Sequence, residues 1–276
     1  MTTSSDEIQI HALRCGTVGT DETIPDRSKS GNPLAFSGLF RGEKHRVWLP
    51  VYSYLIVHPR GKILVDTGWH TDTRLNQKEH MSWQLNIASK AKLPPGEAVS
   101  EQLASLGLKP EDLDLVLFTH LDVDHASGAK LVRGAKRFLA AEDELKAAAG
   151  SDIRYNRRLW DGLPLEPLFF KNTGLGPEGR SLDWFGDGSV RFIDVSGHSA
   201  GTTGVLITRN DRFVFITSDA CYNRASWENQ KVPGLMADKE KAGKALKWIH
   251  DLSLKPGMVE ILATHDPEVE PHTITL

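Results

Sequence analysis

The side chains best suited to bind metal ions are concentrated at residues 120–125, which read His-Leu-Asp-Val-Asp-His. Residues 120, 122 and 124 alternate, so an extended backbone would direct all three side chains to one side. A bend at Asp124 and His125 would then present four ligands around two adjacent centres. Unpaired carboxylate and imidazole groups are costly to bury, and cations such as Zn²⁺, Mn²⁺ or iron remove that cost. We therefore predict that His120, Asp122, Asp124 and His125 bind metal.

Three further residues that can bind metal follow predicted strands, namely His198, Asp219 and His265. Each stands after a run of β-branched and aromatic residues. Taken singly, each is also compatible with an ordinary turn or helix cap. Their recurrence at strand ends favours a shared site, because a motif gains weight from its structural context.

The runs that carry these residues predict a fold of the α/β class. Paired strands precede a helix in each half of the chain, which indicates two mixed sheets packed face to face with helices outside, an α/β/β/α sandwich. We expect strands at residues 51–57, 62–65, 113–119, 190–195, 202–208, 213–217 and 259–263. Helices are expected at residues 96–108, 140–149 and 238–252, and residues 151–188 are expected to be irregular. The whole chain, 1–276, is expected to form a single domain.

Composition narrows the function classes. The chain is 39% hydrophobic and 25% charged with a net charge of -3, and it has no basic block, which argues against nucleic acid as a partner. No apolar run is long enough to cross a membrane, and the N-terminal segment MTTSSDEIQI lacks the features of a signal peptide. The two cysteines, Cys15 and Cys221, are far apart and indicate no disulfide framework. We expect a soluble, cytoplasmic protein.

The stretch H-L-D-V-D-H-A-S-G resembles the H-x-H-x-D-H signature of the metallo-β-lactamase superfamily. The flanking features stand in that family's order: Asp66-Thr67-Gly68 upstream, then Gly197-His198, Asp219 and His265 downstream. Within the superfamily the chain is most similar to the N-acyl-homoserine lactonases. The segment at residues 49–55 and the tyrosine three residues after Asp219, Tyr222, support this similarity. The resemblance covers roughly residues 34–270.

The resemblance implies the four-layer fold of that superfamily and a ligand set for two divalent metal ions. One ion would be held by His120, Asp122 and His198, the other by Asp124, His125 and His265, with Asp219 as the bridge. Asp66 would orient the histidine ligands through hydrogen bonds, as such ligands usually require.

Asp122 departs from the family pattern, which has histidine at this place. A carboxylate there would harden the first metal position and shift its preference from zinc toward manganese or iron. Alternatively, the aspartate side chain is too short to reach and leaves a single-metal enzyme. We expect two ions, with zinc first and manganese or iron as alternatives.

The function implied by the resemblance is hydrolysis of a lactone, with N-acyl homoserine lactones as the leading candidates. A hydroxide between the two metal ions would attack the carbonyl carbon. Tyr222 would donate a hydrogen bond to the developing oxyanion, and Asp124 would pass a proton to the leaving alkoxide. The partner would be a small lactone or ester, and dimers are common among the lactonases that the chain resembles.

Other functions remain open, because a fold does not fix a substrate. The same centre could hydrolyse phosphodiesters or phosphotriesters. Asp122 also allows a redox di-iron protein, although such proteins usually carry a flavin domain for which this chain has no room. A non-catalytic binding protein is the last alternative. The aromatic residues near the N-terminal half could line a substrate pocket or pack in the core: Phe36, Phe40, Trp48, Trp69 and Trp83.

Overall fold

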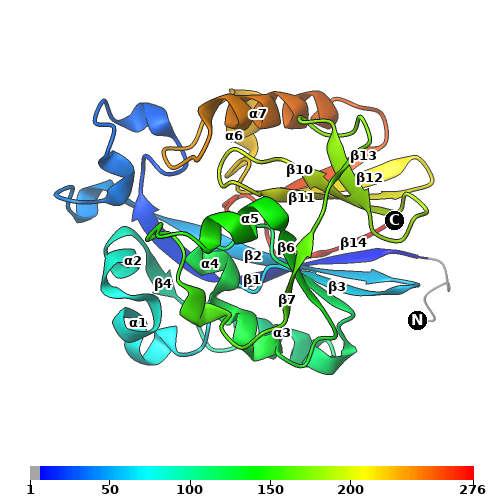
Figure 1. Cartoon of the computed structure of the whole chain (residues 1–276), viewed down its shortest axis with the longest axis horizontal. Helices are drawn as coiled ribbons and strands as arrows, with labels where there is room; N and C mark the ends of the chain where they lie inside the picture. The colour runs from blue at the N-terminus through cyan, green and yellow to red at the C-terminus, as the bar shows by residue number, and fades with distance from the viewer. Residues whose placement is uncertain (1–6) are drawn as a thin grey trace.

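The computed structural model describes residues 7–276 and consists of two β-sheets packed face to face between outer helices (Figure 1). This arrangement confirms the predicted four-layer α/β/β/α sandwich. The first six residues, in the segment where no signal peptide is expected, lie outside the described residues. Among residues 7–276, no helix is both long enough and apolar enough to cross a bilayer.

The first sheet has eight strands in the order β14-β1-β2-β3-β5-β6-β7, with β4 paired to β1. Neighbouring strands from β14 to β3 run antiparallel, and those from β3 to β7 run parallel. The strands are β1 Gln9–Asp21, β2 Arg46–His58, β3 Gly61–Val65, β4 Lys90–Lys92, β5 Leu115–Leu117, β6 Phe138–Ala141, β7 Leu165–Leu168 and β14 Thr273–Thr275.

The second sheet has six strands in the order β13-β12-β11-β10-β9-β8. Only the β12–β13 pair is parallel. The strands are β8 Lys171–Asn172, β9 Arg180–Asp183, β10 Val190–Asp194, β11 Thr203–Arg209, β12 Arg212–Ser218 and β13 Met258–Ala263.

Helices cover the outer faces of both sheets (Figure 1). The longest, α7, begins after Asp238, whose carboxylate accepts hydrogen bonds from the backbone N–H groups of Glu240 and Lys241 and so caps the helix. The helices are α1 Thr73–Met81, α2 Trp83–Ala88, α3 Val99–Ser105, α4 Val123–Ala126, α5 Glu142–Ala148, α6 Arg224–Glu228 and α7 Lys239–Ser253. Short 3₁₀ turns lie at Arg27–Lys29, Ala35–Ser37, Glu43–His45, Pro110–Asp112, Ser127–Val132 and Arg157–Leu159.

The alternation of side chains along the strands divides the apolar core into three layers. In β2, Leu55 faces the layer between the first sheet and its helices, whereas Tyr54 and Ile56 face the layer between the sheets. In β10, Phe192 lies between the sheets, and its neighbour Ile193 packs under α7. Each sheet is therefore buried on both faces, which explains why central strands such as β5 and β12 are almost continuously apolar.

Several elements differ from the prediction, and helices α1, α2 and α6 and strands β4 and β14 lie outside the predicted helices and strands. The alanine-rich residues 140–149 were expected to be one helix, but Ala140 and Ala141 belong to β6 and the helix α5 starts only at Glu142. Pairing with β7, where Ala140 lies opposite Pro167 and Ala141 opposite Leu168, and burial outweigh the helix propensity of alanine there. Residues 151–188 contain β7, β8 and β9 as well as irregular segments. The long β1 was not predicted, because its mixture of polar and glycine residues hides the strand pattern.

Replacing Phe192 with alanine should remove a fully buried ring from the layer between the sheets. We expect the free energy of unfolding to fall by about 3–5 kcal/mol, because a cavity remains. Urea denaturation of chelator-treated protein, followed by circular dichroism, measures this loss without a contribution from bound metal. Phe40→Ala is the control, because the Phe40 side chain is fully exposed and its loss should cost under about 0.5 kcal/mol. Equal losses in both variants would contradict the placement of Phe192.

Candidate metal centre

The strand order brings the seven predicted ligands to one edge of the sandwich. His120 follows β5, His198 follows β10, Asp219 follows β12 and His265 follows β13. Asp124 and His125 lie in α4, directly after the β5 strand end. All four histidines and Asp219 are at most 2% exposed. The sequence-predicted residues are therefore neighbours in space, and they form a buried cluster between the two sheets.

Residues 120–125 are extended only as far as Asp122, which has φ −68° and ψ 156° and precedes the first turn of α4. The change to a helix at Val123, rather than a bend in an extended segment, directs Asp124 and His125 into the cluster. This turn packs closely on the loop after β3. The N–H of Gly128 donates to the carbonyl of Gly68, and a Cβ on Gly128 would lie 2.3 Å from the carbonyl oxygen of Thr67. Only glycine fits there.

Each histidine uses its Nδ1 atom for a fixed hydrogen bond outside the cluster. His198 donates to the Leu235 carbonyl at 3.1 Å and His265 to the Pro50 carbonyl at 2.8 Å, since a carbonyl can only accept. His125 donates to Asp66 Oδ2 at 2.8 Å. His120 Nδ1 lies 3.1 Å from the Thr119 hydroxyl. These bonds leave the Nε2 atoms to face the centre, the arrangement expected of metal-binding histidines.

The Asp66 carboxylate accepts several of the hydrogen bonds that surround the cluster. Its Oδ1 accepts the backbone N–H of Thr119 at 2.8 Å, and its Oδ2 accepts the Thr119 hydroxyl at 2.7 Å and the His125 ring. Because the Thr119 hydroxyl donates to Asp66, it accepts from Ser218 Oγ and from His120. The role expected of Asp66, orienting histidines, is thus present for His125 directly and for His120 through Thr119.

The distances between the inward-facing atoms match those around a bound cation. A tetrahedral ion with bonds of about 2.0–2.1 Å separates its ligand atoms by about 3.3–3.4 Å. His125 Nε2 lies 3.2 Å from Asp219 Oδ1, and His265 Nε2 lies 3.3 Å from Asp219 Oδ2 and 3.5 Å from Asp124 Oδ2. On the other side, Asp122 Oδ2 lies 3.4 Å from His120 Nε2 and 3.2 Å from His198 Nε2.

Three of these atoms are buried without a hydrogen-bond partner among the described residues: His120 Nε2, His125 Nε2 and Asp219 Oδ1. Leaving such groups unsatisfied costs free energy, which a cation would recover. The ligand atoms fall into two groups, His120-His198-Asp219 and Asp124-His125-His265. Asp219 lies between them, close to His198, His125 and His265, as a bridging ligand would. The donor set fits divalent metal ions.

The electrostatics of the cluster also favour a cation. Burial alone would lower the pKa of His125, but the carboxylates of Asp219 and Asp66 outweigh burial and raise that pKa well above its usual value. In the same way, the neighbouring imidazoles of His265 and His125 overcome burial and hold the pKa of Asp219 well below its usual range. Without a metal ion, protons would compensate the carboxylates, so metal binding would release protons.

Tyr222 lies beside this cluster, with its ring stacked on His265 at a centroid distance of 5.1 Å and edge-on to His198 at 6.0 Å. Burial, reinforced by the carboxylates of Asp219, Asp122 and Asp124, raises its pKa well above the usual value. The phenol therefore keeps its proton and can act as a hydrogen-bond donor.

Two charged residues at this centre were not predicted. Glu144 is fully buried and accepts the backbone N–H groups of Leu121 and Gly201, so it joins the two loops that carry His120 and His198. Arg154 forms an ion pair with Asp122 and donates to the carbonyl of His198. The sequence around Arg154 carries no signal, because it lies in the stretch expected to be irregular.

An apolar cavity of about 390 Å³ opens onto the cluster. Asp122, Asp124 and Arg154 line it on the side of the centre. Apolar side chains make up most of the remaining lining, Ile24, Phe36, Leu39, Trp83, Leu85, Ile87, Ile153 and Leu235 among them, and polar residues such as Thr20, Ser37, Gln84 and Asp152 complete it. Of the aromatic residues considered for a pocket, Phe36 and Trp83 lie here. Phe40 is exposed, Trp48 lies under the Lys92 ammonium and Trp69 is buried in the core.

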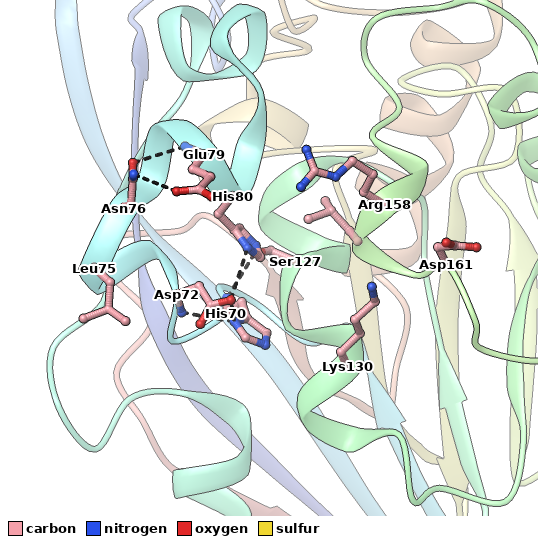
Figure 2. Close-up of a pocket in the computed structure, with 11 residues that line it drawn as sticks. His70, Asp72, Leu75, Asn76, Glu79, His80, Ser127, Lys130, Arg158 and Asp161 are labelled. Carbon is pink, nitrogen blue, oxygen red and sulfur yellow. Dashed lines mark hydrogen bonds and ion pairs between the residues drawn. The ribbon is translucent and has the colours of Figure 1, made fainter.

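A second pocket has a volume of about 460 Å³. His70 and His80 stack on each other in it, and Lys130 and Arg158 also line it (Figure 2). With Asp72, the two histidines have ligand-like spacing. However, His70 Nδ1 already accepts the Asp72 backbone N–H, and the two cationic side chains oppose binding of another cation. Burial, aided by His70, lowers the pKa of His80 to about 4, so its ring is neutral, and it hydrogen-bonds to Ser127 Oγ at 2.8 Å.

Comparison with known proteins extends these findings. The family model described as the metallo-beta-lactamase superfamily matches residues 46–259. The chain is 24% identical to the N-acyl homoserine lactonase AttM of Rhizobium radiobacter over 228 residues, covering 80% of this chain and 83% of that protein. It is 28% identical to the N-acyl homoserine lactonase of Bacillus cereus over 223 residues, with coverage of 80% and 83%.

Solved structures share the fold. An N-acyl homoserine lactone hydrolase with N-hexanoyl-L-homoserine bound at its catalytic metal centre superposes with a TM-score of 0.73 at 21% identity, covering 94% of each chain. A Bacillus thuringiensis AiiA variant with N-decanoyl-L-homoserine at its active site gives a TM-score of 0.74, also at 21% identity and 94% coverage of each chain.

Replacing Asp66 with asparagine should weaken metal binding about 10–100-fold, because His125 loses the carboxylate that fixes its ring and raises its basicity. Competition of the apo-protein with a chromophoric zinc chelator measures the affinity. Asp211→Asn is the matched control: both aspartates have a positive φ, 59° and 63°, which asparagine tolerates, but Asp211 is exposed in a hairpin turn. Unchanged affinity in Asp66→Asn would contradict the orienting role.

Proposed function

Because the chain belongs to the metallo-beta-lactamase superfamily, we propose that it is a metal-dependent hydrolase that opens lactones, with N-acyl homoserine lactones as the substrate class. The observation that carries this proposal is the apolar cavity that ends at Asp122, Asp124 and Arg154. A substrate with a polar ring and an apolar acyl chain fits this division, with the ring at the centre and the chain against Phe36 and Trp83. The lactonase names of the relatives support the same substrate class.

The ligand set implied by the resemblance would hold two divalent ions, with zinc first and manganese or iron as alternatives. His120, Asp122 and His198 would bind one, Asp124, His125 and His265 the other, and Asp219 would bridge. Bound cations of this kind supply a Lewis acid and a nucleophile derived from water at neutral pH. Among the described residues, the cationic side chain of Arg154 contacts Asp122 and His198 of the first group, whereas no ion pair joins Arg154 to Asp124, His125 or His265.

The chain's own residues would position the substrate and move the protons. Tyr222, protonated and only 4% exposed, would donate its phenol proton in a hydrogen bond to the lactone carbonyl oxygen as negative charge develops there. Asp124 lines the cavity and would hold the proton that the ring oxygen takes up when the C–O bond breaks. The apolar walls would exclude bulk water from the acyl chain.

The remaining proposals concern the domain organisation, the assembly and the cellular compartment of the protein. We propose that the chain acts as one domain and that the exposed Trp48, at 40%, contributes to a homodimer contact. Cys15 and Cys221 are both free and buried, which is consistent with a reducing, cytoplasmic compartment.

Lactone hydrolysis should depend on metal and on the length of the acyl chain. Chelator-treated protein should be inactive toward N-acyl homoserine lactones and recover with Zn²⁺, Mn²⁺ or Fe²⁺, as followed by proton release. Trp83→Ala should raise KM for long-chain lactones and leave KM for short-chain ones unchanged, because the lost contact is with the chain. Turnover of an aryl phosphotriester but of no lactone would favour the phosphotriesterase alternative, and no turnover of either would favour a binding protein.

Tyr222→Phe should lower kcat/KM for the lactone about 10²–10³-fold, because one hydrogen-bond donor to the oxyanion is lost. The metal content, measured by elemental analysis, should stay unchanged. Tyr52→Phe controls for loss of a phenol elsewhere, since its hydroxyl donates to the Val269 carbonyl between the sheets. A full rate in Tyr222→Phe would remove Tyr222 from the reaction.

A further inference from the structure

The guanidinium of Arg154 lies inside the first group of predicted ligands. Its Nε donates to Asp122 Oδ1 and its Nη2 donates to Asp122 Oδ2 at 2.7 Å. The same Nη2 lies 2.5 Å from His198 Nε2, and Nη1 donates to the His198 carbonyl at 2.8 Å. The Arg154 side chain is only 10% exposed. It is thus a fixed, buried group whose hydrogen bonds converge on two predicted metal ligands.

Nη2 contacts the atoms that a metal ion would need. The Nδ1 of His198 donates to the Leu235 carbonyl, so Nε2 carries the ring's one free lone pair. That lone pair accepts from Nη2, and an N–H group and a metal ion cannot share it. Asp122 Oδ2 accepts from the same nitrogen. A guanidinium nitrogen therefore stands where an ion held by Asp122 and His198 would stand.

In the first group, His120 Nε2 also stays without a hydrogen-bond partner among the described residues, but the Asp122 and His198 atoms beside it are occupied by Arg154. The second group, together with Asp219, offers a complete set of free ligand atoms. His125 Nε2 and Asp219 Oδ1 are buried and have no hydrogen-bond partner among residues 7–276, although they lie 3.2 Å apart. His265 Nε2 and Asp124 Oδ2 face the same space at 3.5 Å from each other. The free lone pairs of this group point to one ion position, next to the position taken by Arg154.

We propose that Arg154 replaces the first metal ion, so that the protein binds a single divalent ion tightly, at Asp124, His125, His265 and Asp219. The departure at position 122 then has a physical reason: histidine there would repel or leave unpaired a buried guanidinium, whereas aspartate holds it in a bidentate ion pair. A second ion could bind only by displacing this cation and leaving a buried charge without its partner. The guanidinium supplies the second positive charge at the cavity.

The test is metal stoichiometry. This inference rests on the proposed metal-dependent function, but its readout does not require turnover. Apo-protein is loaded with excess Zn²⁺, passed through a desalting column and analysed for zinc per chain. The wild type should retain about one ion, and Arg154→Ala about two, because Asp122 and His198 are freed. Arg158→Ala, four residues further on and lining the separate pocket, is the control and should retain about one.

Arg154→Gln provides a second variant if Arg154→Ala does not fold, as judged by circular dichroism, and it should also gain an ion. Two tightly bound ions in the wild type, or one ion in both Arg154 variants, would overturn the inference. Lactone hydrolysis by the same samples separates it from the proposed function. One ion in the wild type without lactonase activity would refute only the function, whereas two ions with lactonase activity would refute only the replacement.

Discussion

Three hydrogen bonds to the Asp66 carboxylate connect the first sheet to the metal centre. Thr119 supplies two of them, from its backbone N–H and its hydroxyl, and His125 supplies the third. Asp66 itself has a φ of 59°, a conformation that few side chains adopt and that aspartate tolerates better than most. Because Thr119 in turn orients His120, one carboxylate fixes imidazoles from both groups of predicted ligands. The geometry of both groups therefore depends on the end of β3.

The second constraint is burial. Side chains with free lone pairs are enclosed between two sheets, where unsatisfied atoms are costly, and each protein contact around them reduces that cost. Glu144 accepts hydrogen bonds from the buried backbone N–H groups of Leu121 and Gly201 and so satisfies them. The histidine Nδ1 atoms have their partners in carbonyl oxygens, Asp66 and Thr119. Within the cluster, the atoms that remain unsatisfied are His120 Nε2, His125 Nε2 and Asp219 Oδ1, which face the space where a cation would fit.

Asp122, in place of the histidine of the family pattern, changes the charge balance at the centre. Asp122 adds a negative charge, and Arg154 adds a positive charge that lies against it. The pair is neutral as a unit, and it also forms the end of the apolar cavity. The Asp122–Arg154 ion pair leaves the ligand atoms around Asp124 available for a metal ion. In the proposed arrangement, the guanidinium and one metal ion together provide the positive charge at the centre. The substrate pocket and the ion pair are thus parts of one surface.

The fold and most of the predicted ligands can be inferred from the sequence alone. The strand ends at His120, His198, Asp219 and His265 are local patterns, because a short apolar run and the polar residues that follow it are recognised from neighbours in the chain. These patterns predict the four-layer fold, and the resemblance implies the ligand set. Tertiary structure alone determined the rest. Ala140 and Ala141 became a strand because β7 lies beside them, and the partner of Asp122 proved to be Arg154, 32 residues away in a stretch without periodicity. A long-range ion pair leaves no local pattern, since its energy depends on burial and approach that only the folded chain creates.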